Sequence, residues 1–214
     1  DLIKFTGVNP EKITVTLESA DELPKGNESV DELIGKKFIM YIGRPTPHKN
    51  LRRLIDAFAL LQKKYPDLTL ALAGKKDSNY ARHETYVNEH EIKNVVFTGF
   101  ISDEQLRWMY ENTAVYCFPS LSEGFGLPGL EAMLHGAPVA SSTATCLPET
   151  HGDAAYYFNP FSAEDIAKSI DDILSDDKLR NELVKKGKKH VKTFSWQRMA
   201  EQTLAVYEKY GRKS

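Results

Sequence analysis

The sequence predicts a doubly wound α/β domain built on a parallel sheet, and two patterns carry this prediction. Short segments that are apolar throughout recur between residues 38 and 142, as expected of strands buried on both faces of a sheet. Longer segments with apolar residues at helical spacing separate them, as expected of crossover helices. The chain of 214 residues is long enough for one core of this kind.

The predicted elements follow one another in order along the chain. Strands are expected at residues 38–43, 68–74, 94–100, 114–120 and 137–142. ITVTL at 13–17 resembles a further strand, and counting it makes 137–142 the sixth. Helices are expected at 50–65, at about 78–91, at 102–113 and at 127–136. Asn50 caps the start of the first helix and Pro66 ends it, while Ser102 and Gln105 have the spacing of a capping box.

The two ends of the chain differ from this middle part. Residues 1–34 are polar and are expected to be a linker or the remnant of a preceding domain, so that 35–214 forms the ligand-binding domain. Three helical patterns close the chain at 163–176, 177–194 and 195–210, with no strand between them. The beginning, DLIKFTGVNPEK, lacks Met and lacks the basic and apolar regions of a signal peptide, so we expect a fragment without a secretion signal.

The composition disfavours several classes of protein. Lys and Arg number 28 and Asp and Glu 30, and this near-neutral balance does not suit a general nucleic-acid binder. No apolar run approaches the roughly 20 residues of a membrane helix. Cys117 and Cys146 are the only cysteines, which favours a reducing compartment and hence a cytoplasmic protein. The basic run at 185–190 is expected to be a solvated helix face, with peripheral contact to the inner face of a membrane as the alternative.

In a doubly wound sheet the ligand binds at the carboxyl ends of the strands. We therefore expect functional residues in the turns at 43–50, 74–79, 99–102, 119–128 and 142–148. The first turn contains Arg44 and Lys49, which suit a diphosphate because Arg can bind two phosphate oxygens and Lys adds a point charge. No D-x-D motif occurs, so no metal is expected. Two solvated surface cations are the alternative interpretation.

The glycine-rich stretch at 120–139 contains G-x-G-x-x-G at Gly124, Gly126 and Gly129. A dinucleotide-binding fingerprint belongs after the first strand, whereas this one follows the fifth, so a dehydrogenase is disfavoured. Small residues let backbone N–H groups approach an anion, and Pro128 suits the start of a helix whose N-terminus is positive. The loop is therefore expected to bind a diphosphate or sugar hydroxyls. A tight turn that uses glycines for geometry alone is the alternative.

Two glutamates flank this loop, Glu123 before it and Glu131 in the following helix. Two carboxylates beside an anion site would repel the anion unless they accept hydrogen bonds from hydroxyl groups. A nucleotide-sugar supplies both the phosphates and the hydroxyls. His48 and His151 are candidate bases that are better interpreted as loop residues, and His135 with Glu131 makes too small a set for zinc.

Three motifs together resemble a known family. They are G-R-x(4)-K-N after the first predicted strand of the middle part, E-G-F-G-L-P-x-L-E-A-M-x-x-G-x-P-V, and F-S-W-x-x-x-A near the end. These residues are similar to the carboxyl-terminal, donor-binding half of retaining GT-B glycosyltransferases of family 4, and the resemblance covers about 36–210. GDAAYYFNP at 152–160 looks most like mannosyltransferases that build bacterial surface polysaccharides, which favours GDP-mannose over UDP-sugars as the donor.

The resemblance implies transfer of a hexosyl group with retention, without a metal and without a cofactor beyond the donor. It assigns Arg44, Lys49 and Glu123 as catalytic. Arg44 and Lys49 would bind the diphosphate, together with Gly43, and Glu123 would face the donor sugar. Glu131 would bind the ribose. Backbone amides would bind the sugar hydroxyls and the distal phosphate at Gly124, Phe125, Gly126 and Leu127, and the turns at Lys75 and Gly99–Phe100 would contact the base.

GT-B enzymes have a second, N-terminal domain that binds the acceptor, here expected to be a glycan or a lipid-linked sugar. That domain is missing from this sequence, so we expect donor binding without turnover. Where the family often shows Asn-Gly-x-Asp, this chain has TLESADEL at 16–23, and that region stays unassigned. Two alternatives stay open: another GT-B enzyme, such as a sugar-nucleotide epimerase or a sucrose/glycogen-type synthase, and a non-catalytic nucleotide-binding module.

Overall fold

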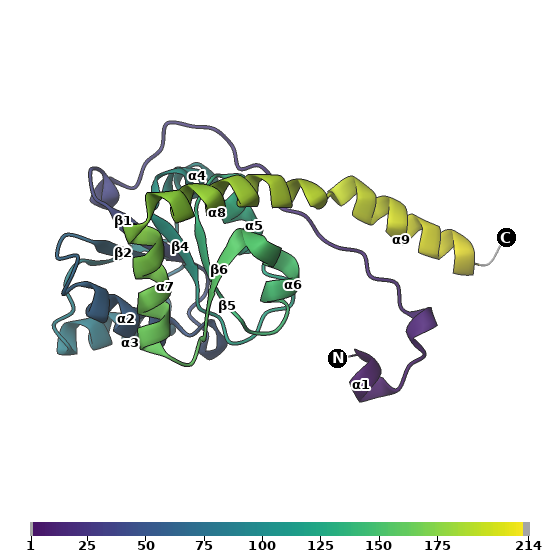
Figure 1. Ribbon diagram of the computed structural model, residues 1–214, viewed down its shortest axis with the longest axis horizontal. Helices are drawn as coiled ribbons and strands as arrows, with labels where there is room; N and C mark the ends of the chain where they lie inside the picture. The colour runs from purple at the N-terminus through teal and green to yellow at the C-terminus, as the bar shows by residue number, and fades with distance from the viewer. Residues whose placement is uncertain (1, 212–214) are drawn as a thin grey trace.

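The computed structural model describes residues 2–211 and contains one parallel sheet of six strands (Figure 1). The strands are β1 (Phe38–Ile42), β2 (Thr69–Ala73), β3 (Val95–Gly99), β4 (Val115–Phe118), β5 (Val139–Ser142) and β6 (Ala155–Phe158). Their order is β3-β2-β1-β4-β5-β6, and every neighbouring pair is parallel. The doubly wound fold is thereby confirmed, and its switch point lies between β1 and β4.

Helices cover both faces of the sheet, and each face has its own buried core. On one face α2 (Leu51–Leu61), α3 (Ser78–Glu89) and α7 (Ala163–Ser175) pack against the sheet. On the other face lie α4 (Asp103–Asn112), α5 (Leu127–Leu134) and the short α6 (Leu147–His151). Alternate side chains of β1 point to opposite faces of the sheet. Ile39 and Tyr41 pack in the core on the first face, and Phe38 and Met40 pack in the core on the second.

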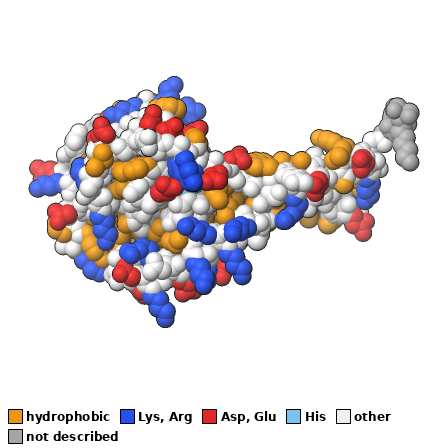
Figure 2. Space-filling model, turned by 90° about the horizontal axis from the view of Figure 1, so that it is seen from above, with side chains coloured by type: hydrophobic (Ala, Val, Ile, Leu, Met, Phe, Trp, Pro, Cys, Tyr) orange, Lys and Arg blue, Asp and Glu red, His pale blue; other side chains and the backbone are white. Residues whose placement is uncertain are grey.

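The helical tail has the predicted order. After α7, α8 (Asp177–His190) packs against α5, α7 and β6, and α9 (Trp196–Tyr210) extends away from the body of the molecule (Figure 1). Hydrophobic side chains are visible along this extension in Figure 2. The head helix α1 (Leu2–Thr6) also lies apart from the sheet. No helix within residues 2–211 combines the length and the apolar character needed to cross a membrane.

Two strand predictions require correction. Residues 13–17 form no strand, because the edges of the sheet are β3 and β6 and this segment pairs with neither; Val15 is 67% exposed. The sixth strand is instead β6, in the segment 152–160 that had been compared only as a motif. The glycine-rich loop therefore follows the fourth strand of the chain and not the fifth.

Local signals at the helix ends are partly confirmed. Ser102 and Gln105 form the predicted capping box, each side chain accepting a hydrogen bond from the other's backbone N–H. Asn50 precedes α2, but its side chain does not cap the helix. The domain boundary expected at residue 34 stays a prediction; Val30 and Leu33 are buried in the second core.

Candidate functional site

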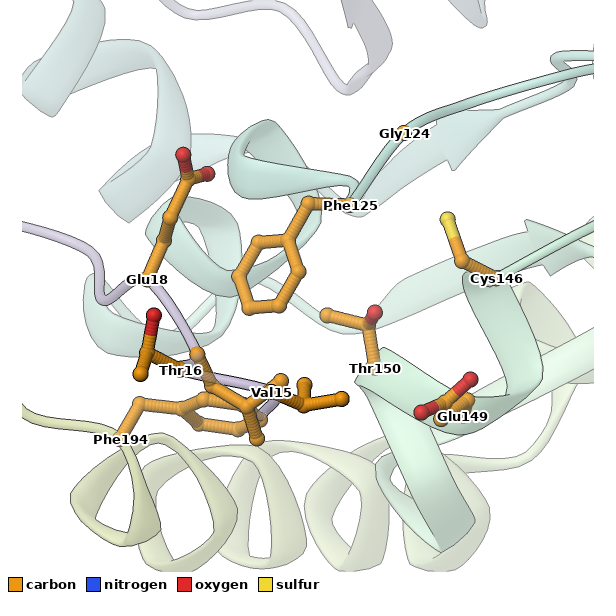
Figure 3. A pocket seen from close by; sticks show the side chains of 10 residues that line it. Val15, Thr16, Glu18, Gly124, Phe125, Cys146, Glu149, Thr150 and Phe194 are labelled. Atoms are coloured by element: carbon orange, nitrogen blue, oxygen red, sulfur yellow. The ribbon is translucent and has the colours of Figure 1, made fainter. Parts of the chain in front are cut away.

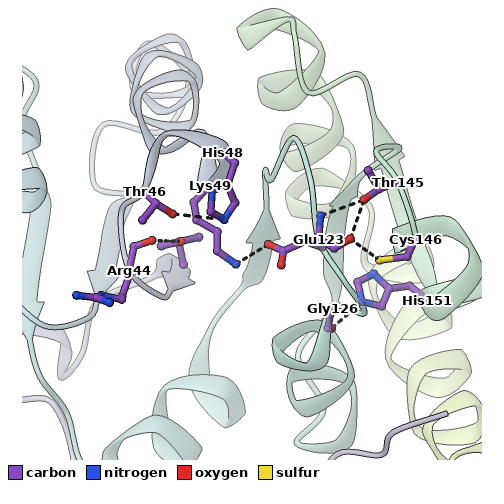
Figure 4. A network of polar contacts seen from close by, with 10 residues as sticks. Arg44, Thr46, His48, Lys49, Glu123, Gly126, Thr145, Cys146 and His151 are labelled. Atoms are coloured by element: carbon purple, nitrogen blue, oxygen red, sulfur yellow. Dashed lines mark hydrogen bonds and ion pairs between the residues drawn. The ribbon is translucent and has the colours of Figure 1, made fainter. Parts of the chain in front are cut away.

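The carboxyl ends of β1 and β4 bring two predicted site residues into contact. The Lys49 ammonium lies 2.6 Å from Oε1 of Glu123 (Figure 4). Lys49 ends a short 3-10 turn after β1, and Glu123 stands in the loop after β4. Their side chains are only 21% and 12% exposed, so this pair is shielded from solvent more than an ordinary surface ion pair. A cation and a carboxylate thus meet at the switch point of the sheet.

Asn50 fixes the turn that carries Lys49. Its backbone is left-handed, with φ of 60°, a conformation that Asn tolerates better than most residues. Its buried side-chain amide donates to the carbonyl oxygens of Pro119 (3.0 Å) and Pro160 (2.8 Å), after β4 and β6. Three segments are thereby tied together behind Lys49. Sequence reasoning assigned Asn50 to helix capping and missed this role, which depends on contacts far apart in the chain.

Two buried tyrosines support the beginning of the same turn. The Tyr80 hydroxyl lies 2.9 Å from the Gly43 carbonyl oxygen and 2.8 Å from that of Ala73, and it donates to this pair of acceptors. The Tyr41 hydroxyl donates to the Arg44 carbonyl oxygen at 3.4 Å. Burial raises the pKa of both tyrosines well above the ordinary value, so both hydroxyls stay protonated and able to donate.

Arg44 is placed differently from Lys49. Its side chain is exposed and forms no ion pair with any residue of the range 2–211. Figure 4 shows its guanidinium turned away from the contact between Lys49 and Glu123. The structure therefore brings Lys49 and Glu123 together and leaves Arg44 near them in the chain but pointing elsewhere.

The glycine-rich loop is held from behind by residues of the turn after β5. The Glu123 N–H donates to Oγ1 of Thr145 at 3.0 Å, and Sγ of Cys146 lies 3.2 Å from the Glu123 carbonyl oxygen (Figure 4). A Cβ added at Gly124 would meet nothing within 4 Å, so the backbone there is open to a ligand. Sequence reasoning pointed to the turn 142–148 but not to Thr145 or Cys146 as its contributing residues.

Beside this loop lies a cavity of about 500 Å³ (Figure 3). Gly124 and Phe125 form part of its wall, and residues 15–18 of the polar head close the opposite side. The head segment thus approaches the loop, although it forms no strand.

Glu131 lies on α5, behind the loop. The Tyr110 hydroxyl is 3.3 Å from its Oε2. Burial raises the pKa of Glu131, the Tyr110 hydrogen bond opposes this shift, and the nearby Asp103 and Asp21 add to it. A half-buried carboxyl of this kind can accept hydrogen bonds from hydroxyl groups.

Lys75, Gly99 and Phe100 follow β2 and β3 at the same edge of the sheet. Lys75 is exposed, and the Phe100 ring is 83% exposed. Gly99 has φ of 75°, which allows the turn after β3. No hydrogen bond or ion pair within the described residues joins Lys75, Gly99 or Phe100 to the side chain of Lys49 or Glu123.

The histidines differ from their sequence interpretation. His48 lies in the turn before α2 and is exposed, as expected of a loop residue. His151 is not a loop residue: it ends α6, and its ring is completely buried. His135 follows α5, where its Nδ1–H donates to the Glu131 carbonyl oxygen and its Nε2 accepts from Leu23 N–H. Within residues 2–211 no three His, Cys, Asp or Glu side chains gather as a metal site.

This doubly wound parallel sheet, which brings a lysine–glutamate contact and a glycine-rich loop to its switch point, matches the fold of GT-B glycosyltransferases. More specifically, the chain belongs to the family described as glycosyl transferases group 1, whose model matches residues 26–190. The family resemblance seen in the motifs is thereby confirmed.

Among curated relatives, the O-antigen chain mannosyltransferase B of Escherichia coli is 34% identical over 182 residues, which cover 83% of this chain and 47% of that protein. The chain thus spans about half the length of this relative. Sucrose-phosphate synthase from Thermosynechococcus elongatus has a TM-score of 0.76 at 28% identity, covering 89% of this chain and 51% of that one. A C-terminal domain of a group 1 glycosyl transferase from Francisella tularensis has a TM-score of 0.66 at 28% identity, covering 80% and 94%.

Proposed function

We propose that this chain is the donor-binding domain of a retaining hexosyltransferase that takes its sugar from a nucleoside-diphosphate donor, with GDP-mannose as the favoured donor. The observation that carries the proposal is the 2.6 Å contact between Lys49 and Glu123 beside the open backbone at Gly124. A cation, a carboxylate and approachable backbone amides at one sheet edge match the diphosphate and the hydroxyl groups of such a donor.

Lys49 and Arg44 are proposed to bind the diphosphate without a metal. The exposed Arg44 side chain can turn toward a bound donor, and Lys49 can exchange its contact with Glu123 for phosphate oxygens. When the bond between the anomeric carbon and the diphosphate breaks, its electron pair stays on the diphosphate. The two cations bound to the diphosphate then stabilise that charge, and one well-placed group of this kind contributes about 3 kcal/mol to the lowering of a barrier.

The carboxylates and the loop are proposed to bind the two sugars. Glu123, released from Lys49, accepts hydrogen bonds from hydroxyl groups of the donor sugar, and Glu131 does the same for the ribose. The backbone amides of residues 124–127 bind the distal phosphate and the transferred sugar. The exposed ring of Phe100, with Gly99 and Lys75, offers a surface on which the base can stack.

The remainder of the reaction is proposed to need a second domain. Because the chain spans about half of its curated relative, the acceptor, a glycan or lipid-linked sugar, would bind an N-terminal domain of the same protein. We place the reaction in the cytoplasm, with the basic run 185–190 as a solvated helix face and peripheral contact with the inner face of the membrane as the alternative. In that run Lys185, Lys188 and Lys189 are exposed, while Lys186 pairs with Glu182 at 2.9 Å.

The relative named as a mannosyltransferase supports mannose as the transferred sugar. A second candidate, a synthase of the sucrose-phosphate type, is favoured by the similarity to that enzyme's structure. The test below separates these from an epimerase and from a module that only binds nucleotides.

The first experiment is calorimetric titration of the chain with GDP, UDP and ADP in EDTA. We expect one nucleotide to bind, and the double change Arg44→Ala/Lys49→Ala to weaken it about 100-fold, the effect of two charge-assisted hydrogen bonds. Lys168→Ala/Arg180→Ala removes the same charge from exposed pairs on α7 and α8 and serves as the matched control.

Binding that needs added metal, or equal weakening by both double variants, would contradict the proposed site. If no nucleotide binds, the same titration on a protein that includes the proposed N-terminal domain distinguishes a pocket completed by that domain from a wrong donor class. Incubation of the full-length protein with GDP-mannose and acceptor, followed by NMR of the anomeric proton, then distinguishes retention from inversion, epimerisation or binding without transfer.

A further inference from the structure

His151 is a buried imidazole that the proposed reaction does not use. It lies at the end of α6 and has no exposed surface. Its ring lies against the glycine-rich loop at Gly126 (Figure 4), whereas a Cβ added at Gly124 would meet neither this ring nor any other atom within 4 Å. A fully buried ring cannot reach a donor or acceptor in the solvent-facing site, so any part it plays must be exerted through its neighbours.

Two hydrogen bonds define the state of this ring. Nε2 lies 3.1 Å from the Gly126 carbonyl oxygen, and Nδ1 lies 3.2 Å from Oγ of Ser141 on β5. A carbonyl oxygen only accepts, so Nε2 carries the hydrogen and Nδ1 of the neutral ring is an acceptor. The single hydrogen of the Ser141 hydroxyl has two acceptors in reach, Nδ1 at 3.2 Å and the Ser142 carbonyl oxygen at 3.3 Å. Burial lowers the pKa of His151 to about 4, so the neutral ring with this tautomer is the form present near neutral pH.

The direction of the Gly126 carbonyl determines the direction of the next backbone N–H in the loop. Gly126 precedes α5 with a left-handed φ of 99°, and no side chain caps the helix there. Its carbonyl oxygen accepts two hydrogen bonds, one from the Gly129 N–H at 3.0 Å and one from His151. Together these two bonds occupy both lone pairs of the oxygen. Because a peptide unit is planar and trans, fixing this carbonyl toward His151 turns the Leu127 N–H of the same peptide the opposite way.

The position of His151 also explains why two of the three positions in the G-x-G-x-x-G stretch are glycines. A Cβ added at Gly129 would lie 2.3 Å from His151 Nε2, and one at Gly126 would lie 3.2 Å from it and 2.7 Å from a methyl group of Leu147. A Cβ at Gly124 would meet nothing. Two of the three glycines therefore leave room for the imidazole, and only Gly124 leaves room on the open side.

We propose that His151 is a positioning residue whose ring, behind the loop, fixes the Gly126–Leu127 peptide so that the Leu127 N–H faces the donor's distal phosphate and sugar. The direction toward a donor rests on the proposed function. The contacts among His151, Gly126 and Gly129 do not depend on it.

The variants His151→Leu and His151→Gln test this role. Leucine fills similar space without a donor group, whereas the glutamine amide can donate to the Gly126 carbonyl. We expect His151→Leu to weaken GDP binding about tenfold, as for one lost hydrogen bond, and to leave GMP binding unchanged, because GMP lacks the distal phosphate. His151→Gln should restore GDP binding. Equal losses for GDP and GMP, or a glutamine variant that behaves like leucine, would overturn the proposal.

Measurements without nucleotide keep the test independent of the proposed function. In the unmodified chain, ¹⁵N NMR of the ring should show hydrogen on Nε2 alone at pH 7, and hydrogen on Nδ1 would overturn the proposal. Amide exchange at residues 124–127 should quicken in His151→Leu and recover in His151→Gln. Gly129→Ala should destabilise the unmodified chain much more than a chain carrying His151→Ala, and additive effects would contradict the packing explanation.

The two ideas fail in different ways. A chain that binds no nucleotide, alone or at full length, but shows the expected ring tautomer, exchange and coupling removes the proposed function and leaves the loop-fixing role of His151. Normal GDP binding by His151→Leu removes the inference and leaves the proposed function.

Discussion

The two turns that meet at the switch point are fixed in contrasting ways. The turn after β1 offers side chains, and it holds one of them, Lys49, on Glu123 while the neighbouring Arg44 stays exposed. The loop after β4 offers backbone amides, and hydrogen bonds from other segments hold its backbone, among them those of the buried His151 and the exposed Thr145. Where the functional atoms are backbone atoms, the residues that orient them lie elsewhere in the chain and do not belong to the motif.

The largest expected effect is a loss of stability at low pH, caused by the buried His151 beside the loop after β4. The folded chain keeps His151 neutral down to a pKa of about 4, whereas the unfolded chain protonates it near the ordinary value of 6.5. The unfolded state therefore binds more protons between these values, and stability falls as pH falls through that window. The loss amounts to about 3 kcal/mol.

Urea unfolding from pH 7 to pH 4 measures this loss, and His151→Gln provides the comparison. The variant should show a flatter decline over the same window, since the carboxylates contribute equally to both chains. His190 and Glu123 are the titratable neighbours that influence the pKa of this ring, and neither is altered in the variant. Parallel curves for the two chains would contradict the prediction.

The next effect concerns Asn50 and the turn after β1. Asn50→Ala leaves the carbonyl oxygens of Pro119 and Pro160 without their buried donor and should cost about 2–3 kcal/mol of unfolding free energy. Asn94→Ala is the matched control, because Asn94 is also left-handed (φ 55°) and also donates to a carbonyl, that of Pro66, but is exposed. We expect about 1 kcal/mol there. If the two variants lose similar amounts of unfolding free energy, Asn50 does not hold the segments at Pro119 and Pro160 together as proposed.

A smaller effect tests the link between the two turns. Glu123→Gln removes the charge that holds Lys49 in the ligand-free chain, so Lys49 becomes freer to bind phosphate. We expect GDP affinity to rise about threefold, in keeping with a pair of about 1 kcal/mol or less. Affinity for GDP-mannose relative to GDP should fall. Calorimetry with Asp171→Asn, which breaks the Lys64 pair elsewhere, provides the control, and a fall in GDP affinity would refute the competition.

The smallest effect separates Arg44 from Lys49. Arg44 is exposed and has no ion pair among residues 2–211, so Arg44→Ala should change the free energy of unfolding by no more than about 0.5 kcal/mol. Urea unfolding in the absence of ligand measures this. A larger loss would show that the exposed arginine supports the fold of its turn.

Much of the fold was predictable because its signals are local. Continuous apolar runs gave five strands, and the Ser102–Gln105 spacing gave a helix start that the structure confirms. The edge strand β6 is only four residues long and half-buried in its middle, and its short AYYF run lies within the segment 152–160 that was interpreted only as a motif. ITVTL has the residue types of a strand, but it pairs with neither edge strand, β3 or β6. Pairing depends on the whole sheet and not on composition.

For the candidate site, the sequence motifs indicated some of the residues but not the distant residues that hold them. The motifs pointed to Lys49 and Glu123, and the fold brings them into contact. Thr145, Asn50 and His151 escaped, because each acts on a partner at least 22 residues away along the chain. Nothing in the residues themselves distinguishes a buried histidine that orients a peptide from a histidine in a loop.

The contact between Lys49 and Glu123 also has a consequence for folding. Its partners are 74 residues apart in sequence, and they follow β1 and β4, the two strands on either side of the switch point. The half containing β1, β2 and β3 pairs strands in sequence order, whereas the β1–β4 pairing must close a much longer loop. The nascent chain therefore cannot assemble its site as it emerges: the half that carries Lys49 is synthesised before Glu123 exists, and the pair forms only when the two halves join.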